Sequence, residues 1–523
     1  MLDGNPLQIV SALMAVDTSA MDPRATLAHI ASLVDAAGDA GFADGLDRAE
    51  ALLDELAVKP APPAVSARSH YCRANLWAHR HELNGGRGSW AWSDPVAEAE
   101  LLELRRCVRH TGFSALGQIE RAQALTNLAN RLNSIGRFVE AVEVWDRALK
   151  VEPRLAMARG NRGVGLTAYA RALYDDGHQA VLLAHAWRSL RAAAAADALI
   201  ETEGLEPAFE QFSRYQCSIE NYLDPEVVFA GLDLTAWPLG RSSAEQRYRS
   251  WCLDHRLFLN PLNDLGAYPL AARDVLTLPT ITTPLSQADA PAIIRFFNVL
   301  KQEYVSARYT FYEGDDASRM HFSDREVLLY NTLDYPALGL AVERVKTAYR
   351  AAYSIFDKTA FLLNNYLELG HAERQITFRT VWYRSARSQA LHPKLDGLAN
   401  WPLRGLFWLS RDIFEAGFQA ASDPDAEALH ELRNHLEHKF VTVHSEGIGL
   451  GRVGAMEPGL IEITYDDLSR RTVHILKLAR AALLYVSLAV HSEEERRRAN
   501  DREAKLSVPV PLHVWEDRWK HHF

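Results

Sequence analysis

The sequence has few cysteines and lacks the common motifs of several enzyme classes. Its 523 residues include only four cysteines, Cys72, Cys107, Cys217 and Cys252, which are scattered and form no Cys-x-x-Cys pair. Such usage is typical of reduced thiols in a cytosol and gives no zinc pattern. The chain also has no P-loop, no His-Glu-x-x-His and no Gly-x-Ser-x-Gly. The sequence therefore offers no motif for a P-loop nucleotidase, a zinc protease or an α/β-hydrolase.

Long hydrophobic runs and an excess of positive charge are missing too. Ala481–Val490 is apolar but far shorter than the roughly 20 residues that span a bilayer, so we expect a core helix there. The N-terminus, Met1–Asn5, lacks the basic start of a secretory signal, and we expect a cytoplasmic protein without a membrane partner. A net charge of −10 argues against a globally basic nucleic-acid binder but leaves room for a small RNA site.

The chain is long enough for two or three domains, and its first 200 residues read as helical repeats. The clearest unit, Ala122–Leu155, resembles a tetratricopeptide (TPR) repeat, in which small alanines let two helices approach and Trp145 fills the gap between repeats. The residues that carry this resemblance are Leu125, Leu128, Ala129, Leu132, Gly136, Ala141, Trp145, Ala148 and Pro153. Since one repeat cannot be stable alone, we expect looser repeats on both sides, in a solenoid that binds a peptide or protein or only scaffolds the next domain.

The remaining sequence predicts a connector, a helical domain and a charged tail. Residues 201–290 look like an irregular connector with ordered, proline-rich loops. A helical pattern starts at Asp289, a long helix is predicted over about 336–370, with Gly370 as its C-cap, and a core helix over about 467–491. Residues 493–523 read as a charged helix extension and an aromatic tail that docks on the protein.

A helix predicted over 424–444 carries the most suggestive residues. Asp423 suits the N-cap and Pro424 the first helical position. The spacing of Leu429, Leu432, Leu436, Phe440 and Val443 predicts one buried stripe. Asn434 and His438 project almost opposite that stripe, and Arg433 lies nearer its edge.

These residues have a functional and a purely structural interpretation. An Asn and a His at i, i+4 with a neighbouring Arg could address a phosphate or a second subunit. Alternatively, Arg433 and Glu437 form a weak solvated ion pair and His438 stays idle. The bare Arg-to-His spacing also recurs at Arg24 and Arg105, but only Arg433 is followed by Asn.

Arg433-Asn434 followed by His438 resembles the signature of the HEPN domain, an all-helical unit whose active members are metal-independent endoribonucleases. Further short words over about 245–492 resemble a bacterial HEPN subfamily that follows TPR repeats. They are Trp251–Leu253, Leu257–Leu265, Asn331–Pro336, Tyr353–Lys358 and Leu406–Ser410.

This resemblance implies an all-α protein with a TPR-like domain at 1–200, a connector at 201–290, a HEPN domain at 291–492 and a tail at 493–523. It implies His438 as general acid or base, Arg433 as stabiliser of the transition state and Asn434 as an orienting residue. Asp357 and Lys358 are candidates for a surrounding shell, or a structural polar pair.

Partners and cofactors follow from the same resemblance. We expect an RNA substrate, a homodimer through the HEPN domain that makes a composite site, a peptide or protein trigger on the TPR face, and no cofactor or metal. The implied role is a toxin-like, antiphage ribonuclease. The alternative is a catalytically inactive HEPN/TPR scaffold or nucleotide-binding adaptor.

Two other sequence patterns resemble binding motifs, but we interpret both as structural features. Gly449–Gly454 matches a Gly-x-Gly-x-x-Gly pattern but has no βαβ context, so we interpret it as a flap, closed by a short strand at Leu460–Thr464. His435, Glu437 and His438 could imitate a metal site, but their spacing splays them and a surface cluster is favoured.

Overall fold

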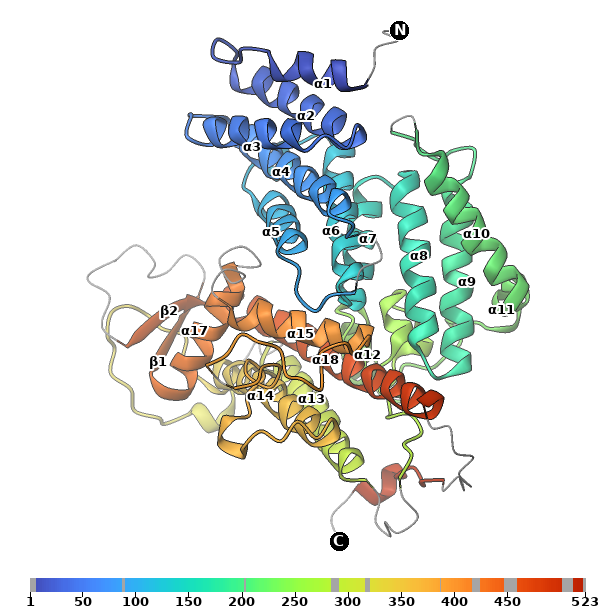
Figure 1. Cartoon of the computed structure of the whole chain (residues 1–523). Coiled ribbons are helices and arrows are strands. Elements are labelled where there is room, and N and C mark those ends of the chain that lie inside the picture. The colour runs from blue at the N-terminus through green and yellow to red at the C-terminus, as the bar shows by residue number, and fades with distance from the viewer. Residues whose placement is uncertain are drawn as a thin grey trace.

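The computed structural model describes residues 6–86, 90–201, 204–283, 291–315, 320–385, 387–415, 424–445, 459–500 and 511–520. Helices dominate this part of the chain, with one two-stranded sheet, so the predicted all-α fold class is confirmed (Figure 1). The predictions for Asp289, Asp423 and the flap at Gly449–Gly454 lie outside the described residues.

The N-terminal part is a stack of helices that pack as neighbours along the chain (Figure 1). Aspartates at Asp22, Asp94 and Asp175 begin three of them by accepting hydrogen bonds from free backbone N–H groups of the first turn. The helices are α1 Pro6–Met14, α2 Pro23–Asp39, α3 Ala43–Ala57, α4 Pro63–Leu83, α5 Pro95–Arg109, α6 Gln118–Ser134, α7 Phe138–Val151, α8 Ala156–Ala172 and α9 Asp176–Ala193, with a 3-10 turn η1 at Phe113–Ala115.

The unit predicted at Ala122–Leu155 is a helical pair, α6 and α7, joined through Gly136 at φ +91°. Trp145 is 1% exposed, and its Nε1 donates to Asn130 Oδ1 at 3.0 Å. A Cβ added at Gly165 of α8 would lie 2.2 Å from the Trp145 ring, so the indole packs directly on the next helix. The predicted packing role of Trp145 is confirmed, and a TPR-type repeat is compatible with this geometry.

The expectation of an irregular connector at 201–290 is wrong for much of that stretch. It contains α10 Glu206–Tyr222, α11 Pro225–Gly231 and α12 Ser243–Asp254, with 3-10 turns η2 Pro261–Asp264 and η3 Pro269–Ala271. Helix α10 packs on α8 and α9 and so continues the N-terminal stack. The loop before η2 is ordered, as predicted, because buried Arg480 donates to the carbonyls of Phe258 and Asn260 and to Asp264.

The C-terminal part is a second group of helices, which lies below the first in Figure 1. Its elements are α13 Ala292–Asp315, η4 Phe322–Asp324, α14 Leu340–Tyr366, η5 Glu373–Gln375, α15 Trp401–Phe414, α17 Pro424–His438, β1 Phe440–His444, β2 Leu460–Thr464, α18 Tyr465–Asn500 and η6 Asp517–Lys520. Helix α14 starts four residues later than predicted, after Pro336 and Gly339, and ends at Tyr366 before Gly370. The tail residues 511–520 are exposed, so the prediction that the tail docks is wrong for them.

The helix predicted over 424–444 ends at His438, and the rest of it is a strand. Phe440–His444 pairs in parallel with Leu460–Thr464, the strand that was predicted. Phe440 is therefore 76% exposed instead of lying on a helical stripe, while Val443 is 1% exposed through the strand. The sequence Phe-Val-Thr-Val favours a strand, and a partner twenty residues away decides the matter where local periodicity cannot.

Helix α18 forms the centre of the C-terminal part. It is longer than predicted. Within the part of the chain that the structure describes, it is the one helix that is long enough and apolar enough to cross a membrane. However, 83% of the apolar 18-residue stretch of this helix is buried inside the protein, where the helix packs against α14 and α15. Such burial is typical of a core helix, in agreement with the prediction for Ala481–Val490.

The two groups of helices meet backbone to backbone at two glycines. A Cβ added at Gly405 of α15 would lie 2.2 Å from the carbonyl oxygen of Gly136, and one added at Gly136 would lie 2.3 Å from that of Trp401. Only glycine permits this approach. Trp401 Nε1 also donates to the Asn133 carbonyl at 2.9 Å. The apolar core is accordingly continuous from the N-terminal stack into α18.

A buried charge cluster stands next to this contact. Arg105 of α5 donates to both oxygens of Asp412 of α15, at 2.8 and 2.7 Å, and Arg137 donates to the same carboxylate. Burial alone would raise the pKa of Asp412, but the charges of Arg105 and Arg137 outweigh it and lower the pKa to about 2. The carboxylate is thus ionised at neutral pH, and it ties α15 to two N-terminal helices.

Replacing Trp145 by Ala should destabilise the N-terminal stack by about 3–5 kcal/mol, because it leaves a large cavity between α7 and α8. Urea unfolding followed by circular dichroism measures the change. Trp519→Ala is the matched control, since Trp519 is 43% exposed and should tolerate truncation. An unfolding curve for Trp145→Ala that matches the wild type would contradict the packing role.

Replacing Gly405 by Ala tests the contact between the two groups of helices. The contact predicts a loss of stability, whereas a Gly-to-Ala change inside a helix usually increases stability. In a helix interior this change normally stabilises by up to about 1 kcal/mol. Here the new Cβ collides with the Gly136 carbonyl, so we expect a loss of about 1–3 kcal/mol in thermal unfolding experiments. Gly231→Ala in α11 is the control, because a Cβ there meets nothing within 4 Å. A Gly405→Ala protein as stable as the wild type would contradict the close contact between Gly405 and Gly136.

Candidate functional site

Helix α17 carries the residues that the sequence singled out. Its apolar face is built as predicted by Leu429 and Leu432, both 0% exposed, with Leu436 partly buried against the same core. The face packs on α14 and α15. The opposite side of the helix is therefore left for polar chemistry.

Side chains of α14 hold α17 by its backbone. The Tyr349 hydroxyl donates to the Leu429 carbonyl at 2.6 Å, and Arg350 Nη1 donates to the Leu436 carbonyl at 3.3 Å. Leu436 lies in the last turn of α17, where carbonyls lack helical partners, so Arg350 satisfies one of them. These bonds position the helix without using its outward-facing side chains.

A hydrogen-bonded chain of side chains runs across α17. The Tyr353 hydroxyl lies 3.1 Å from His430 Nδ1, and His430 Nε2 lies 3.1 Å from Asn434 Nδ2. Arg433 Nη1 donates in turn to Asn434 Oδ1 at 3.1 Å. Tyr353 is 3% exposed, so the chain begins in the core and ends at a guanidinium near the surface.

This chain determines which atoms of His430 and Asn434 donate. An arginine can only donate, so the Asn434 oxygen faces Arg433 and its amide nitrogen faces His430. The amide nitrogen can only donate as well, so His430 Nε2 accepts and the ring proton is on Nδ1. Burial, then the charges of Arg433 and Arg379, lower the pKa of His430, against the opposing effect of Asp357. His430 is thereby kept neutral and able to orient Asn434.

Arg433 and His438 leave the helix in different directions. Arg433 lies over the Tyr353 ring, with Cζ 5.8 Å from the ring centre, whereas His438 is exposed at the end of α17. Five residues at about 100° each place the two side chains about 140° apart around the helix, whereas Asn434 and His438 are about 40° apart. One copy of α17 does not aim Arg433 and His438 at one point.

Only one of the two candidates on α14 shares contacts with this site. Asp357 accepts a hydrogen bond from the Phe378 backbone at 3.0 Å, and its charge acts on His430. This bond fixes the segment that carries Arg379. Lys358 instead pairs with Glu303 of α13 at 2.6 Å, so the structure does not bring it to α17.

The two histidines near the end of α17, His435 and His438, lie in different environments. His435 is 7% exposed and bonds the Glu431 carbonyl at 3.0 Å, so the expectation of a surface cluster is wrong for it. The His435 ring is thus held against the preceding turn of its own helix, while His438 faces solvent. Within the described residues, no three His, Cys, Asp or Glu side chains come together as ligands.

His430, Tyr353 and Arg379 were not among the predicted site residues. A signal for His430 was present, because it precedes Asn434 by four residues and so continues the row of Asn434 and His438. Tyr353 and Arg379 come from segments about 50 to 80 residues away in sequence. Nothing in local spacing indicates their place, which the packing of α14 on α17 decides.

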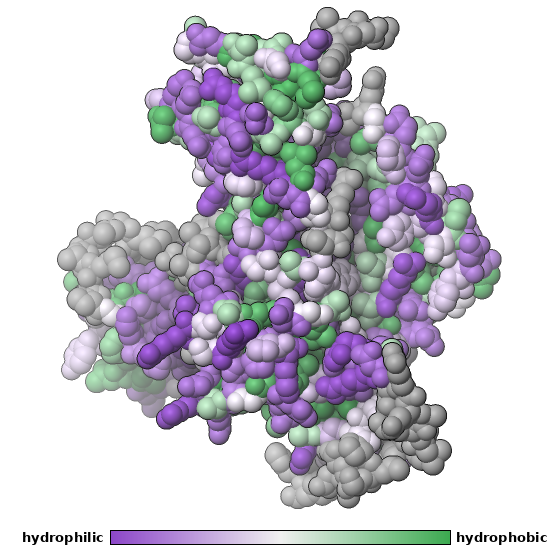
Figure 2. Space-filling view, viewed as in Figure 1, coloured by the Kyte–Doolittle hydropathy of each residue, from purple (hydrophilic) through white to green (hydrophobic). Residues whose placement is uncertain are grey.

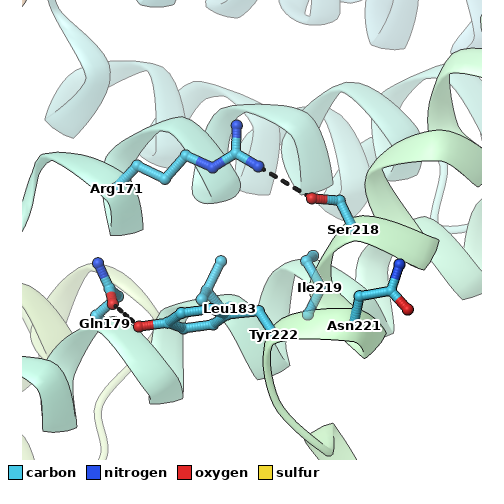
Figure 3. Close-up of a pocket in the computed structure, with 7 residues that line it drawn as sticks. All are labelled: Arg171, Gln179, Leu183, Ser218, Ile219, Asn221 and Tyr222. Atoms are coloured by element: carbon cyan, nitrogen blue, oxygen red, sulfur yellow. Dashed lines mark hydrogen bonds between the residues drawn. The ribbon is translucent and has the colours of Figure 1, made fainter.

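A separate hollow of about 350 Å³ lies in the N-terminal stack between α8, α9 and α10 (Figure 3). Its floor is apolar, formed by Leu183 and Ile219, and its rim is polar. Arg171 donates to the Ser218 hydroxyl at 3.2 Å across one side, and the Tyr222 hydroxyl donates to Gln179 Oε1 at 2.8 Å across the other.

Comparison with known proteins gives one match. Residues 285–493 match the family model described as LA2681-like HEPN, and this range covers α13 to α17 and most of α18. The match does not extend to the N-terminal helices. Comparisons with curated proteins and with solved structures found no match. The C-terminal part of this chain, residues 285–493, is an LA2681-like HEPN domain.

Proposed function

We propose that this protein is a metal-independent endoribonuclease whose site is formed by Arg433, Asn434 and His438 of α17. The observation that carries the proposal is the chain from buried Tyr353 through His430 and Asn434 to Arg433. A core-anchored chain that ends on a surface arginine positions a phosphate-binding group in advance. Phosphate recognition by guanidinium is favoured by geometry and by permanent charge.

The proposed reaction is attack by the ribose 2′-oxygen on the adjacent phosphorus. A base removes the 2′-hydroxyl proton, a new O2′–P bond forms, and the P–O5′ bond breaks as an acid protonates the leaving O5′. The products are a 2′,3′-cyclic phosphate and a free 5′-hydroxyl. His438 is assigned acid or base, because an exposed imidazole can accept or donate a proton, while Arg433 stabilises the charge that builds on the phosphoryl oxygens.

His430 and Asn434 act through Arg433. The Nε2 lone pair of His430 is occupied by Asn434, so this histidine is a positioning residue. Asn434 accepts a hydrogen bond from Arg433 and so restrains the position of its guanidinium.

Two copies of the chain complete the proposed site. The reaction needs both an acid and a base, and one copy supplies one exposed histidine on α17. Because Arg433 and His438 point about 140° apart on one helix, a second α17 related by a two-fold axis supplies the missing group. The predicted homodimer is therefore part of the proposal.

The proposed biological role is a toxin-like ribonuclease in the cytoplasm, which halts growth during phage infection. A peptide or protein trigger on the N-terminal stack would control it. The hollow between α8, α9 and α10 favours this part of the proposal, since an apolar floor with polar groups on its rim suits a peptide side chain (Figure 3).

Replacing Arg433 or His438 by Ala should lower RNA cleavage at least about 100-fold, the usual scale for loss of an acid–base group. Thermal unfolding of His438→Ala should match the wild type, because His438 is exposed. His513→Ala, an exposed histidine in the tail, is the control and should cleave normally. Normal cleavage by His438→Ala at equal protein concentration would refute the assigned site.

Chelation and product analysis test the chemistry. Cleavage should persist in excess EDTA, and the 3′ ends should carry 2′,3′-cyclic phosphate, detected by mass spectrometry of a short RNA. Complete loss of cleavage in EDTA, restored by Mg²⁺, would point to a metal nuclease. A wild-type protein that binds nucleotides and cleaves no RNA would favour the inactive adaptor.

A further inference from the structure

An exposed apolar segment of the HEPN domain, which we call the arm, comprises residues 320–338. Together with Phe440 it exposes ten large apolar side chains, each between 56% and 90% exposed. They are Met320, Phe322, Val327, Leu328, Leu329, Tyr330, Leu333, Tyr335, Leu338 and Phe440. Apolar residues appear in green at the lower left of Figure 2, where Figure 1 places the arm and β1.

The arm is held in place at both its base and its edge. The Asp324 carboxylate accepts from Leu340 N at 3.2 and 3.0 Å, so the two ends of the arm meet where α14 begins. Farther along, Ala337 N donates to the Val443 carbonyl at 2.6 Å, which attaches the arm to β1. This is the geometry of a compact surface loop whose ends are joined.

The backbone of the arm adopts costly conformations. Glu326, Leu333 and Tyr335 have φ values of 62°, 68° and 54°, in the left-handed region that non-glycine residues rarely enter. Two of these residues also carry exposed apolar side chains, since Leu333 is 60% and Tyr335 is 58% exposed. A strained backbone that presents apolar side chains to solvent is typical of a functional surface rather than of a passive linker.

The size of the arm matches one half of a stable protein interface. Ten large side chains with this exposure offer on the order of 1,000 Å² of apolar surface, and a standard interface uses about 800 Å² from each partner. The largest apolar patch on an ordinary monomer is about 300–600 Å². The exposed area is therefore more than a solitary chain normally leaves uncovered.

The charged residues of the arm narrow the range of molecules that could dock on it. Residues 327–333 carry no charged side chain, so two copies can meet there without repulsion between like charges. The whole arm has one arginine, Arg325, against three acids, Asp324, Glu326 and Asp334. Such a surface is poor in the basic residues that RNA and anionic lipid attract.

The position of the arm relates it to the site. Strand β1, to which the arm is attached, begins two residues after His438, and exposed Phe440 extends the apolar surface to the end of α17. A partner seated on the arm therefore lies beside His438.

We propose that the arm and Phe440 dock on the same surface of a second copy of this chain and so bring two α17 helices together. The inference deepens the proposed function, on which its consequence for catalysis rests. The evidence for the docking itself, from area, charge and backbone, is independent of any nuclease activity.

The test is the solution mass of the full-length protein by light scattering at micromolar concentration. The wild type should show twice the chain mass of 58.6 kDa. Leu328→Glu combined with Tyr330→Glu should raise the dimer dissociation constant at least about 100-fold, because it buries charges in an apolar interface. Val58→Glu is the control, since Val58 is 84% exposed in the N-terminal stack and should leave the dimer intact.

A wild-type monomer, or an arm variant that stays dimeric, would overturn the proposal. Cross-linking checks the position of the contact independently of the arm variant's stability. In a Cys217→Ser background, which removes the exposed cysteine, Leu328→Cys should form a covalent dimer with a bismaleimide, whereas Val58→Cys should not. Failure of Leu328→Cys to cross-link in a dimeric protein would place the interface elsewhere.

RNA cleavage separates this inference from the proposed function. If the wild type cleaves RNA and the arm variant does not, both the docking surface and the nuclease function are supported. A dimer that depends on the arm but cleaves no RNA would support the proposed interface and contradict the proposed nuclease function. An arm variant that is monomeric and cleaves as well as the wild type removes the composite site, while the docking surface stands.

Discussion

The close approach of Gly136 and Gly405 is the constraint on which the rest of the structure depends. With a Cβ at either position, α15 would be pushed away from the turn between α6 and α7. The neighbouring charges of Arg105, Arg137 and Asp412 are stable only while that approach keeps them together and dry, because a buried charge without its partner is costly. Packing at the glycines thus permits the charge cluster, and the cluster fixes how α15 is oriented.

Helix α15 then connects the N-terminal stack to the candidate site. It carries Gly405 and Asp412 at the contact with the stack, and it ends at Phe414, whose ring meets His430 edge-on at 5.7 Å. Helix α15 therefore contacts both the stack and His430, which is hydrogen-bonded to Asn434 and through it to Arg433. The apolar core is continuous along this route, so the stack and the HEPN domain share packing instead of being joined by a flexible linker. This gives a proposed trigger on the stack a short physical route to the proposed nuclease site.

The elements that the sequence predicted best are those with long, regular patterns. The α6–α7 pair, the packing of Trp145 and the burial of α18 follow from helical periodicity, which is local. The connector and the end of α17 were predicted wrongly for a common reason. Residues 201–290 hold helices that are stabilised by the stack beside them, and Phe440–His444 is a strand because Leu460–Thr464 lies next to it. Such partners are distant in sequence, and local spacing does not contain them.

For the candidate site, the sequence by itself determined the residue types and their places along one helix: Arg433, Asn434 and His438, with a signal for His430 that was overlooked. Tertiary structure decided which of them interact. The packing of α14 brings Tyr353 to His430, leaves Lys358 with Glu303 and keeps His438 in solvent. The physical reason is that helical spacing fixes the direction of each side chain, whereas hydrogen bonds, burial and pKa depend on atoms supplied by other helices.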